Sequence, residues 1–137
     1  MITLRSTLFP SLLSSLAVAL PILVSGCASK DAGPTRYDLS GKVTFNGAPV
    51  PAGEITLSPD SSKGNSGPGG IVMIENGEYK TPRGAGIVGG PYVVHILGFD
   101  GVPNKESEEG MPIFPPYETT VDFPREPTTH DFEIPGT

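Results

Sequence analysis

Glycine and proline recur so often along this chain that they restrict the secondary structure it can form. Eighteen Gly and sixteen Pro together make up about a quarter of the 137 residues. From residue 27 to the end, no stretch free of both residue types is longer than seven residues. A helix of three turns needs a longer stretch, because Gly and Pro are destabilising in a helix interior. We therefore expect no long helix in this part of the chain.

Between these breakers, apolar and polar residues alternate with the period of a half-buried β-strand. Alternating or apolar stretches lie at residues 37–45, 54–58, 71–75, 91–99, 117–123 and 131–134, and a further one leads to Tyr79. Asn46-Gly47 and Asn76-Gly77 are dipeptides suited to the positive φ angles of hairpin turns. Seven short strands at hairpin spacing predict an all-β fold, specifically an antiparallel β-sandwich.

The stretch 91–99 is the most hydrophobic of the predicted strands, and it is apolar on both of its faces. We therefore expect it to be a central strand of a sheet. The segments 60–70, 83–90 and 101–116 are rich in Gly, Pro or polar residues, and we expect them to be loops.

The first 26 residues have the layout of a secretory signal peptide. Arg5 is the only charged residue before Lys30, and an apolar stretch extends from Leu8 to Val24. An uncleaved signal anchor is the alternative. The prolines and serines within the stretch make it a poor membrane-spanning helix, which needs about 20 apolar residues.

The apolar stretch ends in Leu23-Val24-Ser25-Gly26-Cys27, which resembles a bacterial lipobox. This resemblance implies cleavage between Gly26 and Cys27 and attachment of lipid to the Cys27 thiol. Because each buried CH₂ of an acyl chain contributes about 0.8 kcal/mol, a multiply acylated Cys27 would be a lasting membrane anchor. We expect residues 1–26 to be the signal peptide, 27–36 the lipidated Cys and a polar tether, and 37–137 the β-domain.

Ala28, the residue after the cysteine, bears on which membrane receives the lipid. In enterobacterial lipoproteins an Asp at this position favours retention at the inner membrane. The resemblance therefore implies an envelope location at the outer membrane or the periplasmic face rather than at the inner membrane.

Charge and cysteine content exclude several classes of function. The net charge is −6 at pH 7, and nucleic-acid binding depends on basic clusters that neutralise phosphates. One Cys cannot form a disulfide framework, and one Cys with two His offers too few ligands for a structural zinc site. We expect no nucleic-acid partner, no cofactor and no metal.

Residues 41–57 (GKVTFNGAPVPAGEITL) resemble the opening of a carboxypeptidase regulatory-like domain, with a first strand, a turn and a step of proline, small residue and glycine. Asn76-Gly77-Glu78-Tyr79 is similar to that family's Asp-Gly-x-Phe hairpin, and Gly90-Pro91-Tyr92 to its Gly-x-Tyr start of a core strand. The similarity covers about residues 38–99. Two departures are the long loop 60–70 and the acidic insert after Phe99.

The resemblance implies a transthyretin-like, Greek-key β-sandwich without catalytic residues. It therefore implies a lipid-anchored binding or structural module that contacts an envelope protein or a glycan. The candidate contact residues are Lys63 and Asn65 in loop 60–70, and Glu106, Glu108, Glu109 and Phe114 in the segment 100–116.

Two other functions stay open. Asp100, Asn104 and the three glutamates of the acidic insert could bind calcium and make the domain a calcium-stabilised adhesin, although a solvated loop is favoured. A transthyretin-like hydrolase is disfavoured because the family's histidine and arginine constellation and its C-terminal motif are not present in this sequence. His95 is interpreted as a packed or edge histidine, and His130 is expected on the side of Phe132.

The segment Met111–Pro116 is apolar and stiffened by its prolines. It is interpreted as folding over the edge of the sandwich, with an exposed contact patch as the alternative.

Overall fold

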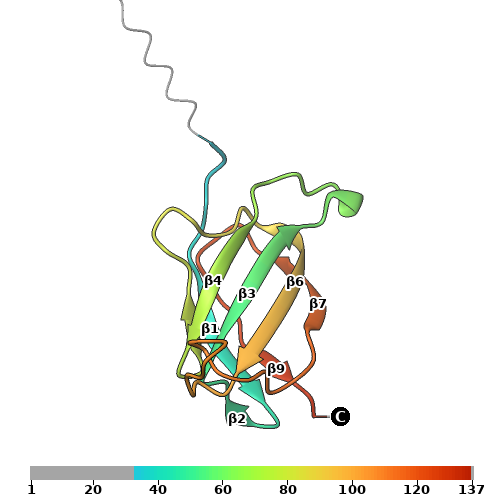
Figure 1. Cartoon of the computed structure of the whole chain (residues 1–137). Helices are drawn as coiled ribbons and strands as arrows, with labels where there is room; N and C mark the ends of the chain where they lie inside the picture. The colour runs from blue at the N-terminus through green and yellow to red at the C-terminus, as the bar shows by residue number, and fades with distance from the viewer. Residues whose placement is uncertain (1–32, 137) are drawn as a thin grey trace, which may run out of the picture. The chain divides into compact units, whose positions relative to one another are not determined.

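The computed structural model describes residues 33–136, and its regular structure consists of nine β-strands and one short 3₁₀-helix (Figure 1). The strands are β1 (Leu39–Phe45), β2 (Ala48–Pro49), β3 (Ala52–Pro59), β4 (Gly70–Glu75), β5 (Glu78–Lys80), β6 (Gly90–Phe99), β7 (Tyr117–Phe123), β8 (Thr128–Thr129) and β9 (Phe132–Ile134). The 3₁₀-helix η1 spans Ser61–Lys63. The prediction of an all-β domain is confirmed, and the two-residue strands β2 and β8 are additions to the predicted set. The predicted signal peptide, its cleavage site and Cys27 lie outside the described residues.

Within residues 33–136, no helix has the length and apolarity required to span a membrane.

The strands pair in the order β2-β1-β5-β4-β3-β6-β7, and every pair along this path is antiparallel. β8 and β9 instead pair with β1 in parallel. The sheet curls, so that in the view of Figure 1 β1 and β9 lie behind β3 and β6. The inner faces of the strands therefore enclose the core.

The core is made of side chains that project inward at every second position of the strands. Its fully buried members come from six different segments: Leu39, Val43, Val50, Ile55, Ile74, Ile87, Tyr92, Val94 and Ile96 are each at most 2% exposed. All of these lie between residues 39 and 96. The apolar residues needed to stabilise the fold are therefore supplied by the β-domain itself.

Both predicted hairpin turns are present. Asn46 and Gly47 have φ angles of 51° and 76°, and Asn76 and Gly77 have φ angles of 52° and 78°. Positive φ at two successive residues is the geometry that Asn-Gly supports best between two strands. The first turn joins β1 to β2, and the second joins β4 to β5.

β6 is an interior strand, as predicted, because it pairs with β3 on one side and with β7 on the other. Only one of its faces is buried, however. Tyr92, Val94 and Ile96 are at most 1% exposed, whereas Leu97 on the opposite face is 37% exposed. On this second face, His95 and Leu97 are exposed, whereas Val93 and Phe99 are half-buried.

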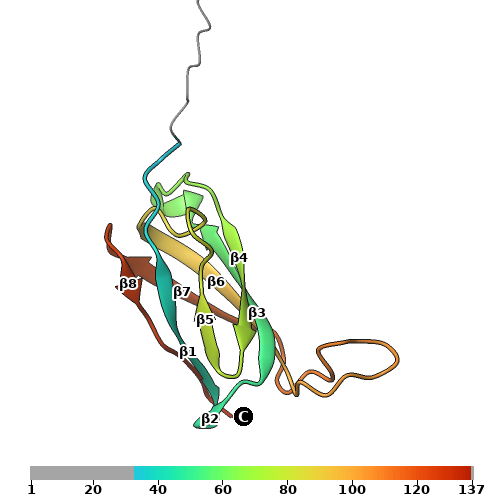
Figure 2. The same ribbon diagram turned by 90° about the vertical axis from the view of Figure 1, so that its left-hand side faces the viewer.

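The three predicted loops are present, and the segment after β6 extends away from the sheet before returning to β7 (Figure 2). The end of this segment folds back on the domain, as interpreted. The Ile113 backbone N–H donates to the Gly98 carbonyl (3.0 Å), and the buried Phe114 ring lies 5.1 Å from that of Phe45.

Candidate binding surface

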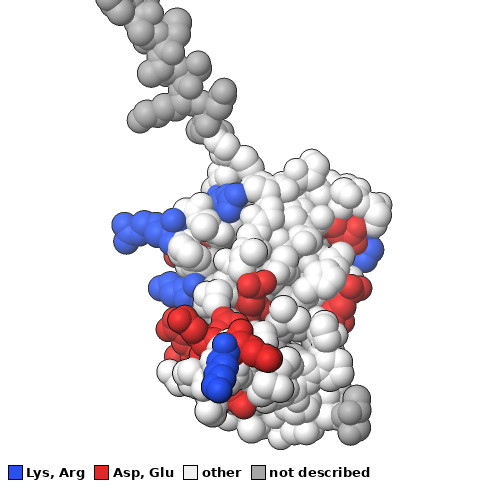
Figure 3. Space-filling view, in the orientation of Figure 1, with Lys and Arg blue, Asp and Glu red and all other residues white. Residues whose placement is uncertain are grey.

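The outer face of β4, β3 and β6 carries a set of exposed aliphatic side chains. Ile71 is 60% exposed, Met73 47% and Leu97 37%; we call these three residues the outer apolar strip. Ile71 and Met73 are neighbours on this face of β4, whereas Glu54 on β3 pairs with Met73 on one side and with Leu97 on the other and so separates Leu97 from them. Figure 3 shows an acidic side chain near the middle of this face and further acidic residues gathered toward one end.

An open groove adjoins this strip on the face of β4, β5 and β1, and we call it the lateral groove. Its volume is about 700 Å³. The residues that line it are Ser40, Gly41, Lys42, Ile71, Val72, Met73, Glu75, Glu78, Tyr79, Lys80, Pro82, Thr129 and Asp131. Two members of the outer apolar strip thus also form one wall of the groove.

Charges of both signs surround this groove. Lys42 pairs in register with Glu78, and the Asp131 carboxylate accepts a hydrogen bond from the Lys42 backbone N–H (2.8 Å). Among the described residues, neither the Lys42 nor the Lys80 ammonium lies within 4.0 Å of a carboxylate. An apolar wall with a rim of available charges suits contact with another protein, whose interface has an apolar centre and a polar rim.

Beneath the groove, Tyr79 is a structural residue. Its hydroxyl donates to the His130 carbonyl (2.6 Å), and its ring lies 5.8 Å from that of Phe132. Burial, assisted by the negative charge of Asp131, raises the pKa of Tyr79 far above its ordinary value. The phenol therefore stays protonated and holds β5 against the segment between β8 and β9.

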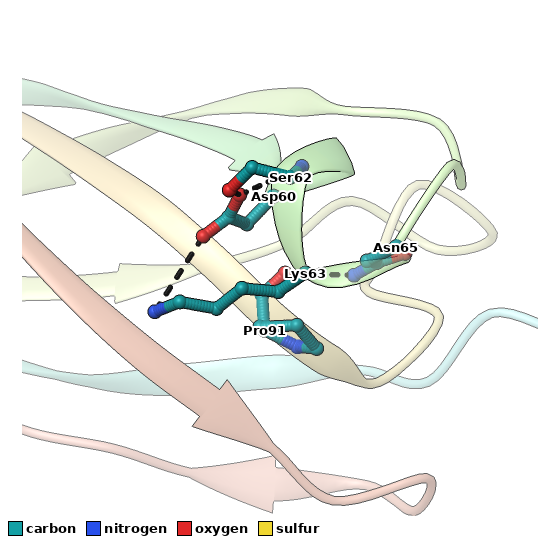
Figure 4. A network of polar contacts seen from close by, with 5 residues as sticks. All are labelled: Asp60, Ser62, Lys63, Asn65 and Pro91. Carbon is teal, nitrogen blue, oxygen red and sulfur yellow. Dashed lines mark hydrogen bonds and ion pairs between the residues drawn. The ribbon is translucent and has the colours of Figure 1, made fainter.

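The start of loop 60–70 is held by its own polar contacts (Figure 4). The Asp60 carboxylate accepts hydrogen bonds from the backbone N–H and the hydroxyl of Ser62, and it lies 3.6 Å from the Lys63 ammonium. The Ser62 hydroxyl bond, with a contribution from the Lys63 charge, lowers the pKa of Asp60. Lys63 is exposed, as expected of a contact residue.

Asn65 does not fit the prediction that it is a contact residue. It is only 9% exposed, and its amide N–H groups donate to the carbonyls of Gly89 (3.1 Å) and Pro91 (2.9 Å). Its side-chain oxygen accepts from the Gly67 backbone N–H (3.2 Å). Figure 4 shows the side chain directed toward Pro91. Asn65 is occupied in holding two loops together and is not available to a partner.

Phe114 is also unavailable, because it is only 7% exposed and packs above Gly98 and beside Val50. Glu106 and Glu108 are exposed, and Glu109 is half-buried. Of the six predicted contact residues, two are therefore interior. The outer apolar strip was not singled out from the sequence, because apolar residues on both faces of 91–99 were interpreted only as the mark of a central strand.

The polar groups of the acidic loop are used within the loop. Asp100 accepts from the backbone N–H groups of Val102 (2.9 Å) and Met111 (3.1 Å). Asn104 accepts from those of Glu106 (2.8 Å) and Ser107 (3.0 Å). In the part of the chain that the structure describes, no three His, Cys, Asp or Glu residues are grouped so that they could hold a metal ion.

The two histidines lie in different environments. The His130 ring packs against those of Phe132 (4.8 Å) and Phe123 (5.5 Å), on the side predicted. The interpretation of His95 as a packed or edge histidine is wrong. Its side chain is 47% exposed on the outer face of an interior strand, and its Nδ1 lies 3.5 Å from the Glu118 carboxylate.

No family model matches this sequence, and neither does any curated protein. Neither comparison therefore assigns a role to the outer apolar strip or to the lateral groove.

Proposed function

We propose that this chain is a non-catalytic, lipid-anchored protein of a bacterial envelope whose β-domain serves as a contact module for another protein. The anchoring half of the proposal is supported by the pattern Leu23-Val24-Ser25-Gly26-Cys27, which resembles a lipobox and follows an apolar stretch. The polar residues after Cys27 lead directly into the described domain and suit a short tether.

The finer fold that we propose is a Greek-key β-sandwich of the transthyretin-like kind found in carboxypeptidase regulatory-like domains. The curl of the sheet around one core is compatible with two facing layers, and the Asn-Gly turns occupy the positions at which the resemblance implies turns. A domain of this family that has the same fold should also show the parallel pairing of β8 and β9 with β1.

The observation that carries the binding half of the proposal is the outer apolar strip beside the lateral groove. Soluble proteins rarely expose contiguous apolar side chains unless the patch has a function, and Met is enriched at protein interfaces. The strip and groove combine aliphatic side chains with Lys and Glu at the margin. We therefore propose a protein partner, and we place the contact on this face rather than on loop 60–70.

The anchoring proposal is tested by fractionation of bacterial cells that express the full chain. We expect the native protein to sediment with membranes and to be released only by detergent. Cys27→Ser, which removes the acceptor thiol, should prevent lipid attachment, so that labelled fatty acid supplied to the cells enters the native protein and not the variant. Equal labelling of the two forms, or labelling of neither, would contradict the proposal.

The contact surface is tested by placing a photo-reactive amino acid at Met73 in the anchored protein. We expect irradiation of intact cells to yield one discrete cross-linked protein product from this position. The same amino acid at Ser66, which is exposed on loop 60–70, is the matched control and should yield none. Cross-linking from Ser66 but not from Met73 would place the contact elsewhere.

A further inference from the structure

β7 forms an open edge of the curled sheet. On one side it pairs with β6 along its full length, from Tyr117 opposite Ile96 to Phe123 opposite Gly90. On its other side, none of the residues 117–123 forms a backbone hydrogen bond with any described residue. Figure 1 shows β7 at the rim of the sheet. A row of backbone donors and acceptors is therefore available along this strand.

The sequence of β7, YETTVDF, contains neither Pro nor Lys, and its charged residues Glu118 and Asp122 oppose the addition of an acidic strand but not of a basic one. Pro and Lys commonly block strand addition at an edge, because Pro removes a donor and Lys opposes stacking of strands. No bulge interrupts the register of β7 with β6. The edge is thus regular over seven residues.

The inner side chains of β7 are less well covered than their neighbours on β6. Tyr117, Thr119 and Val121 are only half-buried. The residues that pair with them are Ile96, Val94 and Tyr92, each at most 1% exposed. The difference arises because β6 has a strand on both sides. One further strand beside β7 would bring Tyr117 and Val121 into the core.

The outer side chains of β7 are acidic at both ends. Glu118 and Asp122 are exposed, and Thr120 lies between them on the same face. Within the described residues, the only basic group that pairs with either carboxylate is His95, which lies 3.5 Å from Glu118. A strand beside β7 with basic residues four positions apart would place a positive charge next to each carboxylate.

We propose that β7 is a docking site for an extended segment of another protein in which apolar residues alternate with polar ones and basic residues stand opposite Glu118 and Asp122. The segment would add a strand to the sheet, with backbone hydrogen bonds giving affinity and the alternate side chains giving specificity. This site is separate from the lateral groove, and the proposal goes beyond the function proposed above.

A second copy of this chain suits the edge less well. Antiparallel pairing of two β7 strands about Thr120 would place Glu118 of each copy opposite Asp122 of the other. Like charges directly opposite on neighbouring strands are destabilising, so a pair of β7 strands would carry two such contacts. A partner strand with basic residues would instead place a positive charge opposite each of these carboxylates.

The test uses the full-length protein in detergent and fluorescent synthetic peptides. The probe Thr-Val-Lys-Val-Thr-Val-Lys-Val-Thr carries Lys residues at the spacing of Glu118 and Asp122. One control peptide has Glu in place of both Lys residues, and the other has Pro in place of the central Thr. We expect the basic peptide to bind saturably in fluorescence anisotropy and both controls to bind at least tenfold more weakly. Hydrogen exchange should slow in residues 117–123.

The double variant Glu118→Lys/Asp122→Lys should reverse the preference, so that the acidic peptide binds more tightly. Asp38→Lys/Glu133→Lys makes the same change of charge at exposed positions outside both β7 and the lateral groove, and should leave the preference unchanged. Slow hydrogen exchange in β6 verifies that each variant is folded. If a variant is not folded, the comparison of the basic and acidic peptides on the native protein tests the proposal by itself.

Three results would overturn the proposal. The first is equal binding of the basic and acidic peptides to the native protein. The second is protection from exchange outside residues 117–123. The third is protection of this segment that rises with protein concentration in the absence of peptide, because that would identify a second copy as the occupant.

Discussion

The Tyr79 hydroxyl links β5 to the segment between β8 and β9 through its hydrogen bond to the His130 carbonyl. Tyr79→Phe removes this bond and leaves the carbonyl without its phenolic donor. We expect the free energy of unfolding to fall by about 0.5–1.5 kcal/mol at neutral pH, as measured by urea denaturation. Tyr37→Phe is the matched control, since the structure shows no hydrogen bond from the Tyr37 hydroxyl, and it should cost less.

The same residue gives the domain a pH dependence. Because the folded state raises the pKa of Tyr79 above its ordinary value of 10, the unfolded chain releases this proton first as the pH rises. The contribution to stability is therefore complete below about pH 10 and is lost as the pH rises above it. We expect the difference in urea midpoint between native protein and Tyr79→Phe to stay constant up to about pH 9 and to shrink between about pH 10 and pH 12. A difference that grows over this range would contradict the assignment.

At the scale of single elements, the two Asn-Gly turns differ in their surroundings although their backbone angles agree. A Cβ atom at Gly47 would meet nothing within 4 Å, whereas one at Gly77 would lie 2.5 Å from the Pro49 Cβ. Gly47→Ala should therefore cost only the penalty of a left-handed backbone, about 1–2 kcal/mol. Gly77→Ala should cost more, because Pro49 must also move. Equal losses of stability in thermal or urea unfolding would show that this contact is not restrictive.

Loop 60–70 and the start of β6 are held together by the Asn65 amide. Asn65→Ala removes three hydrogen bonds and leaves the buried Gly89 carbonyl without its donor, whereas the Pro91 carbonyl keeps its bond from the Asp60 backbone N–H. We expect a loss of about 1–3 kcal/mol in stability and faster hydrogen exchange in residues 61–69 and 87–91. Ser66→Ala, at the exposed neighbouring position, should change neither quantity. If hydrogen exchange is unchanged in Asn65→Ala, the Asn65 amide does not hold the two loops together, and the reason for excluding Asn65 as a contact residue is lost.

Alternation of apolar and polar residues sufficed to predict the seven longer strands and the two turns, because both are encoded in a few neighbouring residues. The parallel pairing of β8 and β9 with β1 was not predicted, since it joins segments about 90 residues apart and depends on the path of the whole chain. For the same reason, nothing in the local sequence distinguishes the buried Asn65 and Phe114 from exposed loop residues. The two apolar sides of β6 correctly predicted an interior strand, but they did not show that one side would be exposed, because which side is buried depends on the curl of the sheet.

At the scale of the molecule, two surfaces of the β-domain are incompletely covered: the outer face with its apolar strip, and the edge of β7. A free-standing structural domain gains nothing from exposing Ile71 at 60% and Met73 at 47%, since covering aliphatic surface is favourable. When an anchored protein and its partner lie at the same membrane, the anchor raises the local concentration of each around the other. Uncovered surfaces such as these two can then serve as contacts between them.

The proposed function requires a mature protein that begins at a lipidated Cys27, and the decisive measurement is the intact mass of the protein purified from bacterial membranes. We expect a chain spanning residues 27–137 whose added mass equals a diacylglyceryl group with or without a further acyl chain. Fragmentation should place this mass on Cys27, and Cys27→Ser should lack it. A mature chain that retains residues 1–26, or one that carries an unmodified Cys27, would rule out the lipid anchor.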